Sequence, residues 1–177
     1  WDWFNGSNAL QVGNDALAFR RMRGEYNQTT GKYEYDSKLY IVDLSNADAP
    51  KLTSTTITND PDSWWGNMKV VGNTLYTTHY EWVEKPLPNV DPNNPSVQQK
   101  VYWVRYYLDQ IDISDRANPK VGARINVPGL LVGASETDPS LLYFVDYRWY
   151  TDYSNNQPKD EIAVARIVNN KAYLKST

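Results

Sequence analysis

The sequence contains no cysteine and only one histidine, His79. The absence of thiols excludes a disulfide framework and thiolate chemistry, and a zinc site built from several Cys or His ligands is excluded as well. His79 lies in a predicted strand, and no motif places a nucleophile and a carboxylate beside it. We therefore interpret His79 as a strand histidine with satisfied hydrogen bonds rather than as a catalytic or metal-binding residue.

Long apolar runs, helix-favouring runs and an excess of basic residues are missing too. The mean hydropathy is -0.66 and the formal net charge is -3 at pH 7. These properties predict a soluble globular chain that does not insert into a membrane and does not bind nucleic acid electrostatically. The chain begins with Trp1 and shows no signal segment, so we expect a mature or excised part of a longer protein.

Aromatic residues, by contrast, are abundant: there are 14 Tyr, 7 Trp and 3 Phe among 177 residues. Tyr and Trp favour β-strands, and their polar tips tolerate half-burial. Together with the lack of helix-favouring runs, this composition predicts an all-β protein with little helix. We expect most of the rings to lie in the core and in cross-strand pairs.

Two short motifs recur along the chain and indicate an internal repeat. The first reads as strand, tight turn, strand, and occurs at 12–17, at 71–75 and in degenerate form at 138–143; Gly-Asn supplies the positive φ of the turn in the first two copies. The second is a hydrophobic run that ends in Asp-x-Ser and leads to Pro-Lys, at 39–52 and at 110–121. A weaker third copy at 162–174 has Arg166 in the Asp position and no Pro.

Because the motifs alternate, each unit contains four strand candidates. We assign approximate units 1–60, 61–128 and 129–177 within a single β-propeller segment, and a loop insertion at 85–100 lengthens the second unit. Four antiparallel strands are typical of a propeller blade, but propellers usually need about four to eight blades to close. The sequence therefore predicts about three blades of a larger propeller, with a β-sandwich or barrel as the alternative fold.

The run at 39–46 (LYIVDLSN), followed by Pro50 and Lys51, resembles the LVIVD-type repeat of secreted or surface bacterial β-propeller proteins. Residues 112–115, followed by Asn118 and Pro119, carry the same pattern. The resemblance implies a propeller and an extracellular, periplasmic or cell-surface location. It implies no catalytic activity, and it supplies no catalytic or cofactor-binding residue.

Asp43 and Asp112 each end a predicted strand just before a polar turn. Such carboxylates could ligate a metal ion or act as a pair. They could also form Asx-type turns, in which the side chain accepts backbone N–H groups. We favour the turns, because every unit of a repeat needs the same connection.

Calcium and carbohydrate are the two ligands for which the sequence offers candidate residues. Calcium takes about six to eight oxygen ligands, and two acidic loops could supply some of them through Asp60, Asp62 and Asp91. Neither loop follows the EF-hand pattern, so solvated loops are the favoured interpretation. Aromatic residues near predicted loops could stack on sugar rings: Tyr33, Tyr35, Trp149, Tyr150 and Tyr153.

These observations favour a binding or scaffold module that contacts a protein or another ligand through its loops. Two other functions stay open: a propeller enzyme that acts on a polysaccharide or other polymer, and a structural subunit of a surface layer or filament. Enzyme activity is less favoured, since no conventional nucleophile–base set is evident. We expect the partners to be the remaining blades of the same polypeptide, then another copy, then a different protein, because an open arc of blades exposes strand faces.

Overall fold

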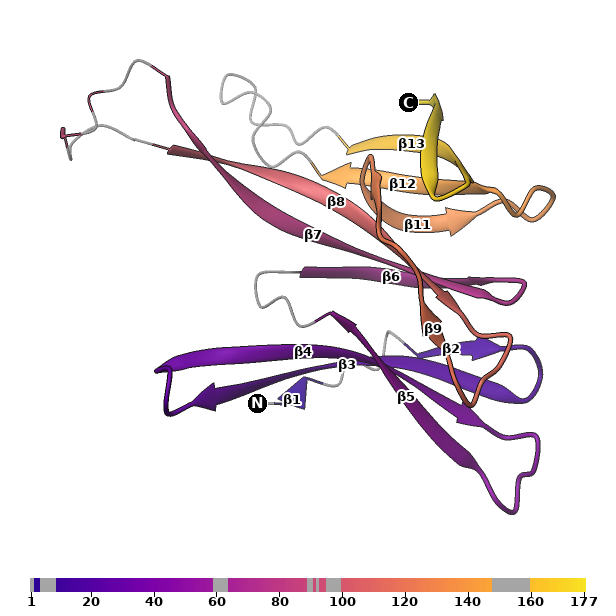
Figure 1. The fold of residues 1–177 in the computed structure, drawn as a ribbon. Helices are drawn as coiled ribbons and strands as arrows, with labels where there is room; N and C mark the ends of the chain where they lie inside the picture. The colour runs from indigo at the N-terminus through magenta and orange to yellow at the C-terminus, as the bar shows by residue number, and fades with distance from the viewer. Residues whose placement is uncertain are drawn as a thin grey trace.

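The computed structural model describes residues 2–3, 9–58, 64–88, 91, 93–94, 100–147 and 160–177. Within these residues the regular structure consists of β-strands, arranged in three antiparallel sheets that lie one above another (Figure 1). The all-β prediction is confirmed. None of the three sheets closes on itself, and the larger propeller stays a prediction. No described helix is long and apolar enough to cross a membrane.

The first sheet is formed by the N-terminal strands. These are β1 (Asp2–Trp3), β2 (Ala9–Val12), β3 (Ala16–Asn27), β4 (Lys32–Asp43) and β5 (Lys51–Thr58). β3, β4 and β5 follow one another across the sheet, and both β1 and β2 pair with the remaining edge of β3. β3 and β4 keep one register along their whole length, whereas β5 reaches along β4 only to Ser37. The β3–β4 hairpin therefore projects beyond β5.

The second sheet has the same plan. Its strands are β6 (Trp64–Val71), β7 (Thr74–Pro86), β8 (Lys100–Asp112), β9 (Lys120–Val121) and β10 (Ile125–Val127). β6, β7 and β8 are consecutive, and the short strands β9 and β10 both pair with β8. β7 and β8 pair without a register shift, while β6 reaches only to Tyr80 and β10 only to Tyr106. The β7–β8 hairpin therefore also projects beyond its neighbours.

The third sheet is a four-stranded meander. Its strands are β11 (Leu130–Ala134), β12 (Leu141–Tyr147), β13 (Asp160–Val168) and β14 (Lys171–Ser176), in this order across the sheet. One bulge interrupts the β11–β12 pairing, and a register shift interrupts the β13–β14 pairing. Asn169 and Asn170, both with positive φ, form the turn between β13 and β14. This turn is of the tight type that joins neighbouring antiparallel strands.

One backbone hydrogen bond recurs in all three sheets, directly after the ends of β4 and β8 and near the end of β13. The N–H of Leu44 donates to the carbonyl of Asp15 at 2.7 Å. In the second sheet the N–H of Ile113 donates to Asn73, and in the third the N–H of Ile167 donates to Ser140. The donors directly follow Asp43, Asp112 and Arg166. These three residues are thus structurally equivalent, which gives a common reference position for comparing the sheets.

Two apolar clusters join the sheets, one on each side of the second sheet. The first packs Leu39 and Ile41 of the first sheet against Leu75 of the second. The other packs Leu108 of the second sheet against Phe144 of the third. Since side chains alternate along a strand, the second sheet presents one set of residues to each neighbour. It is covered on both faces, whereas the described residues of the first and third sheets are covered on one face only.

Asp43 and Asp112 form the turns that the sequence predicts. The backbone N–H of Ser45 donates to Asp43 Oδ1 at 2.9 Å, and the N–H of Ser114 donates to Asp112 Oδ1 at 2.9 Å. These backbone hydrogen bonds stabilise the charged form and hold the pKa of both carboxyls below the ordinary value of 3.8. The two carboxylates are therefore engaged within their own turns.

The third sheet replaces this turn with an ion pair. Arg166, in the Asp position, donates from Nη2 to Asp138 Oδ2 at 2.8 Å. Asp138 Oδ1 accepts from the hydroxyl of Ser140 at 2.6 Å and from its N–H at 3.0 Å. The hydroxyl hydrogen bond is the main reason why the pKa of Asp138 is lowered. In the third sheet the carboxylate thus belongs to the turn before β12, and its ion pair with Arg166 connects this turn to β13.

Candidate functional site

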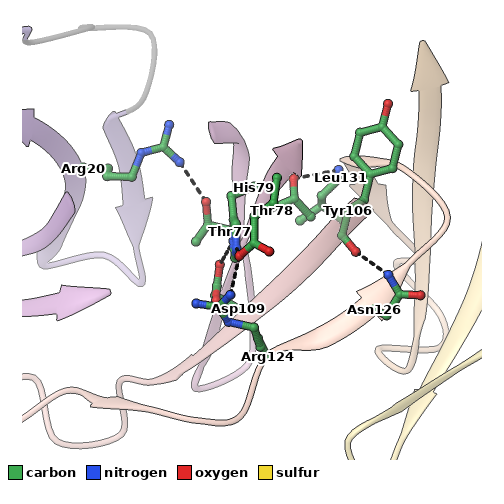
Figure 2. Close-up of polar contacts among 10 residues, drawn as sticks. Arg20, Thr77, Thr78, His79, Tyr106, Asp109, Arg124, Asn126 and Leu131 are labelled. Carbon is green, nitrogen blue, oxygen red and sulfur yellow. Dashed lines mark hydrogen bonds and ion pairs between the residues drawn. The ribbon is translucent and has the colours of Figure 1, made fainter. Parts of the chain in front are cut away.

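A group of polar side chains is buried between the first and second sheets. Arg20 comes from β3, Thr77 and His79 from β7, and Asp109 from β8, and each is less than a tenth exposed. We call these four residues the buried polar cluster. Figure 2 shows them converging from the two sheets. Arg20 follows Ala18 on the same side of β3, so the cluster extends the apolar contact between the two sheets.

Arg20 connects the two sheets directly. Its Nη1 donates to Thr77 Oγ1 at 2.9 Å (Figure 2). Burial lowers the pKa of Arg20 to about 10, while the charge of Asp109 acts in the opposite direction. The guanidinium is therefore still charged at neutral pH. Because a buried charge is costly without an opposite one, Asp109 is the group that makes Arg20 tolerable in this interface.

His79 is held between two carboxylates. Its Nδ1 lies 2.6 Å from Asp109 Oδ2, and both side chains are buried. On the other side of the ring, Nε2 lies 3.6 Å from Glu81 Oε1. A carboxylate on one ring nitrogen fixes the orientation of an imidazole. His79 is thus locked in place between β7 and β8.

Two further residues connect the cluster to the surface. Arg124 donates from Nη1 to Glu81 Oε1 at 2.5 Å. Its guanidinium lies 5.3 Å from the ring centroid of Tyr107, and the Tyr107 ring stacks on His79 at 5.3 Å and 25°. Such a cation over a ring face is attracted by the electrons of the ring. The network therefore runs from a fully buried histidine to an exposed arginine.

The burial of the cluster decides what it can do chemically. A histidine beside an aspartate resembles the base and its orienting group in hydrolases. His79, however, is completely buried and Asp109 nearly so, so a substrate does not reach the ring. The interpretation of His79 as a strand histidine agrees with this burial and with its bond to Asp109. The cluster fixes the β3–β4 hairpin against the β7–β8 hairpin.

Beyond the cluster, both hairpins carry exposed aromatic side chains. Tyr26 and Tyr33 pair across β3 and β4, with ring centroids 5.3 Å apart at 63°. On the other hairpin Trp103 is 61% exposed and the Nζ of Lys85 lies 5.4 Å from its ring centroid. Trp82 is exposed as well. We call Tyr26, Tyr33, Trp82 and Trp103 the hairpin aromatic residues.

Strand alternation places three of these rings on facing sides of the two hairpins. Tyr26 and Tyr33 share the side of the first sheet that carries Arg20, and Trp103 shares the side of the second sheet that carries Asp109. Trp82 lies on the opposite side of its hairpin. Figure 1 shows both hairpins projecting toward the same end of the molecule and diverging there. Arg20 and His79 of the buried polar cluster lie close to where the pairing with β5 and β6 ends, at Ser37 and Tyr80.

The predicted aromatic site is described in part. Tyr33 is exposed at the end of the β3–β4 hairpin, as a carbohydrate-binding role requires. Tyr35 lies in β4, but its side chain is outside the described residues, and so are Trp149, Tyr150 and Tyr153. The structure adds Tyr26, Trp82 and Trp103, which sequence reasoning missed. The sequence offered one signal for them: the rings alternate with other residues along strands that are longer than the strands next to them.

The predicted calcium loops are described only at Asp91, since Asp60 and Asp62 lie outside the described residues. Asp91 Oδ1 accepts the N–H of Asn93 at 2.9 Å. This bond is the Asx-type contact of a polar turn. Within the described ranges, no group of three or more His, Asp or Glu side chains has the arrangement of a metal site. Calcium binding stays a prediction.

Comparison with protein-family models gives no match for this chain, and comparison with curated proteins gives none either.

Proposed function

We propose that this chain is a binding module of the β-propeller kind, acting at the cell surface, in the periplasm or outside the cell. Its contact surface is the pair of projecting hairpins β3–β4 and β7–β8. The ligand class is a carbohydrate polymer, bound by stacking on the hairpin aromatic residues. The location rests on the resemblance of the segments at 39–46 and 112–115 to LVIVD-type repeats.

The observation that carries this proposal is the exposure of large rings on strands that leave the body of the sheets. A folded chain gains by burying a ring, so large exposed rings on projecting hairpins point to a contact surface. Trp103 and Trp82 lie on paired strands of one hairpin, and Tyr26 and Tyr33 lie on the other. Flat rings with polar tips suit sugars, which present both C–H faces and hydroxyl groups.

The second supporting feature is rigidity. Both hairpins keep unbroken antiparallel registers, and the buried polar cluster joins them at their base through the Arg20–Thr77 hydrogen bond. Rings that are fixed before the ligand arrives lose little conformational freedom on binding. The same geometry does not favour the enzyme alternative, because the His79–Asp109 pair is buried beneath this surface.

The test is affinity electrophoresis of the chain in gels that contain soluble polysaccharides, among them glucans, xylan, mannan and glycol chitin. We expect retardation by at least one polymer, and Trp103→Ala should weaken it about tenfold, equivalent to roughly 1.4 kcal/mol of lost contact. Leu174→Ala is the control, since Leu174 is exposed on the third sheet, outside both hairpins and opposite Ala165 rather than on the outer face. The proposal is wrong if no polymer retards the chain, or if both variants lose affinity equally.

A further inference from the structure

The three sheets can be compared residue by residue from the reference positions Asp43, Asp112 and Arg166. Leu39, Leu108 and Ile162 occupy the same place before these residues and point to the same side of their sheets. Leu39 packs against the second sheet and Leu108 against the third, and both are 0% exposed. Ile162 has no fourth sheet above it within the described chain and is 63% exposed.

The opposite faces show the same pattern in reverse. Leu17, Leu75 and Leu142 pair across to the residue that directly precedes the reference position in each sheet. Leu75 packs against the first sheet and Leu142 against the second, and both are 0% exposed. Leu17 lies on the outer side of the first sheet and is 42% exposed. The same residue type at the same position is thus buried twice and open once.

Both outer faces carry further apolar side chains. The outer face of the first sheet also presents Leu52, which is exposed beside Val42, and the stacked rings of Phe19 and Tyr40, whose centroids are 5.1 Å apart. The outer face of the third sheet presents other exposed residues around Ile162: Val168 and Tyr173. Faces of this composition are typical of sheets that pack on another sheet.

We propose that the outer face of the third sheet binds the outer face of the first sheet of a second copy of this chain, head to tail. Each interface seen within the chain joins a face with a Leu39-type residue to a face with a Leu75-type residue. The described residues leave one face of each kind open, so two copies are mutually complementary. If both contacts form, six sheets close a ring, which lies within the range of about four to eight blades for propellers. Two equal contacts related by a two-fold axis leave no face open.

The proposed contact between copies lacks a polar side-chain contact that both contacts between sheets of one chain have at their edge. Arg116 of the second sheet reaches Asp15 of the first at 2.7 Å, and Gln110 of the second bonds to Asn170 of the third at 3.0 Å. Arg116 and Asn170 stand at the same place after their reference residues, and the corresponding residue of the first sheet is Ala47. The contact between copies therefore depends on apolar burial, and salt should affect it little.

The test is light scattering of the 177-residue chain from nanomolar to high micromolar concentration. We expect a mass of twice 20.4 kDa that falls to 20.4 kDa on dilution. Leu17→Lys and Ile162→Glu should each give the single mass at all concentrations. Both substitutions together should restore the doubled mass, because Lys then faces Glu at both contacts. Tyr26→Lys is the matched control, since Tyr26 is exposed but lies on neither outer face, and it should dimerise like the unchanged chain.

Three outcomes overturn the proposal. An unchanged chain of 20.4 kDa at every concentration means that another segment or another protein covers these faces. Loss of dimer with Leu17→Lys but not with Ile162→Glu means that the two first sheets pack on each other. Masses that grow beyond two copies mean an open filament rather than a ring. Far-ultraviolet circular dichroism of every variant ensures that a single mass reflects dissociation and not unfolding. Sugar binding at the hairpins is a separate surface, so this test stands apart from that one.

Discussion

The second sheet packs against the first sheet with one face and against the third with the other, and the two contacts differ in polarity. Toward the first sheet it presents Leu75 and Ile111 at one end and the hydrogen-bonded pair of His79 and Asp109 at the other. Toward the third sheet it presents an apolar surface, in which Thr78 Oγ1 accepts the N–H of Leu131 at 3.0 Å. Neighbouring residues on one strand therefore enter two different environments.

The difference in polarity indicates that the two contacts contribute differently to stability and to the relative positions of the sheets. The contact with the third sheet joins two sheets by apolar packing together with a few hydrogen bonds, among them Thr78 to Leu131 and Tyr106 to Asp146. Burying charges costs free energy by desolvation, so the charged end of the other contact is weak evidence for stability. What it supplies is geometry: the Arg20–Thr77 and His79–Asp109 hydrogen bonds can form only in few relative positions of the strands that carry them. We infer that the buried polar cluster sets the angle between the two hairpins that carry the exposed rings.

The largest expected effect comes from Asp109, because its loss leaves Arg20 without a nearby negative charge and His79 Nδ1 without its hydrogen-bond partner. Asp109→Ala should lower the free energy of unfolding by about 3–5 kcal/mol. Leu108→Ala, the neighbouring residue on the opposite face, should cost about 2–5 kcal/mol by leaving a cavity. Urea denaturation measures both. Only Asp109→Ala should be partly rescued by Arg20→Met in the same chain, and rescue of Leu108→Ala by that change would contradict the assignment.

An intermediate effect is expected at Thr77 and Thr78, which are both fully buried and point to opposite neighbours. Thr77→Val removes an acceptor from a charged guanidinium and should cost about 1.5–3 kcal/mol. Thr78→Val removes an acceptor from a backbone N–H and should cost about 0.5–1.5 kcal/mol. Both substitutions replace a hydroxyl group by a methyl group, so each variant serves as the control for the other. Equal losses in thermal or urea unfolding would mean that the charge of Arg20 is not held in this interface.

The smallest effect is expected at the exposed turns and depends on pH. The folded-state pKa of Asp112 is lowered by its hydrogen bonds to Ser114. Its stabilising contribution is therefore fully present above the ordinary value of 3.8 and is lost as the pH falls through the lowered pKa. Asp112→Asn keeps the hydrogen-bond acceptor and removes the charge, so the stability of this variant should fall less steeply as the pH is lowered. Asp112→Ala should also lower stability at neutral pH. Unfolding midpoints across acid pH would refute the account if both variants behaved like the unchanged chain.

The parts of the fold that the sequence predicts are those with local causes. Gly13 and Gly72 adopt the positive φ that the tight turns require, and Asp43 and Asp112 bond to residues just ahead of them. The third copy, aligned at Arg166, is equivalent to the others in its backbone hydrogen bond. These features depend on a few neighbouring residues, which a single sequence displays.

The buried polar cluster was not predicted, because its causes are not local. Arg20, His79 and Asp109 come from three strands of two sheets, and each looks like an ordinary strand residue in the sequence. A signal existed in β3, where Ala16, Ala18 and Arg20 alternate on one face, so that Arg20 continues an apolar row. The exposed rings of Trp82 and Trp103 were missed for a similar reason. Their exposure follows from the length of β7 and β8 relative to β6 and β10, which propensity does not reveal.

The central claim is that the three sheets are copies of one unit, so that the leucines at equivalent positions differ in whether a neighbouring sheet covers them. Leucine-to-alanine substitution at Leu17, Leu75 and Leu142, followed by urea unfolding of the monomeric chain at low concentration, tests this most directly. We predict losses of about 2–5 kcal/mol for Leu75→Ala and Leu142→Ala, and a loss below about 1 kcal/mol for Leu17→Ala. Losses of similar size at all three positions would contradict the equivalence of the sheets.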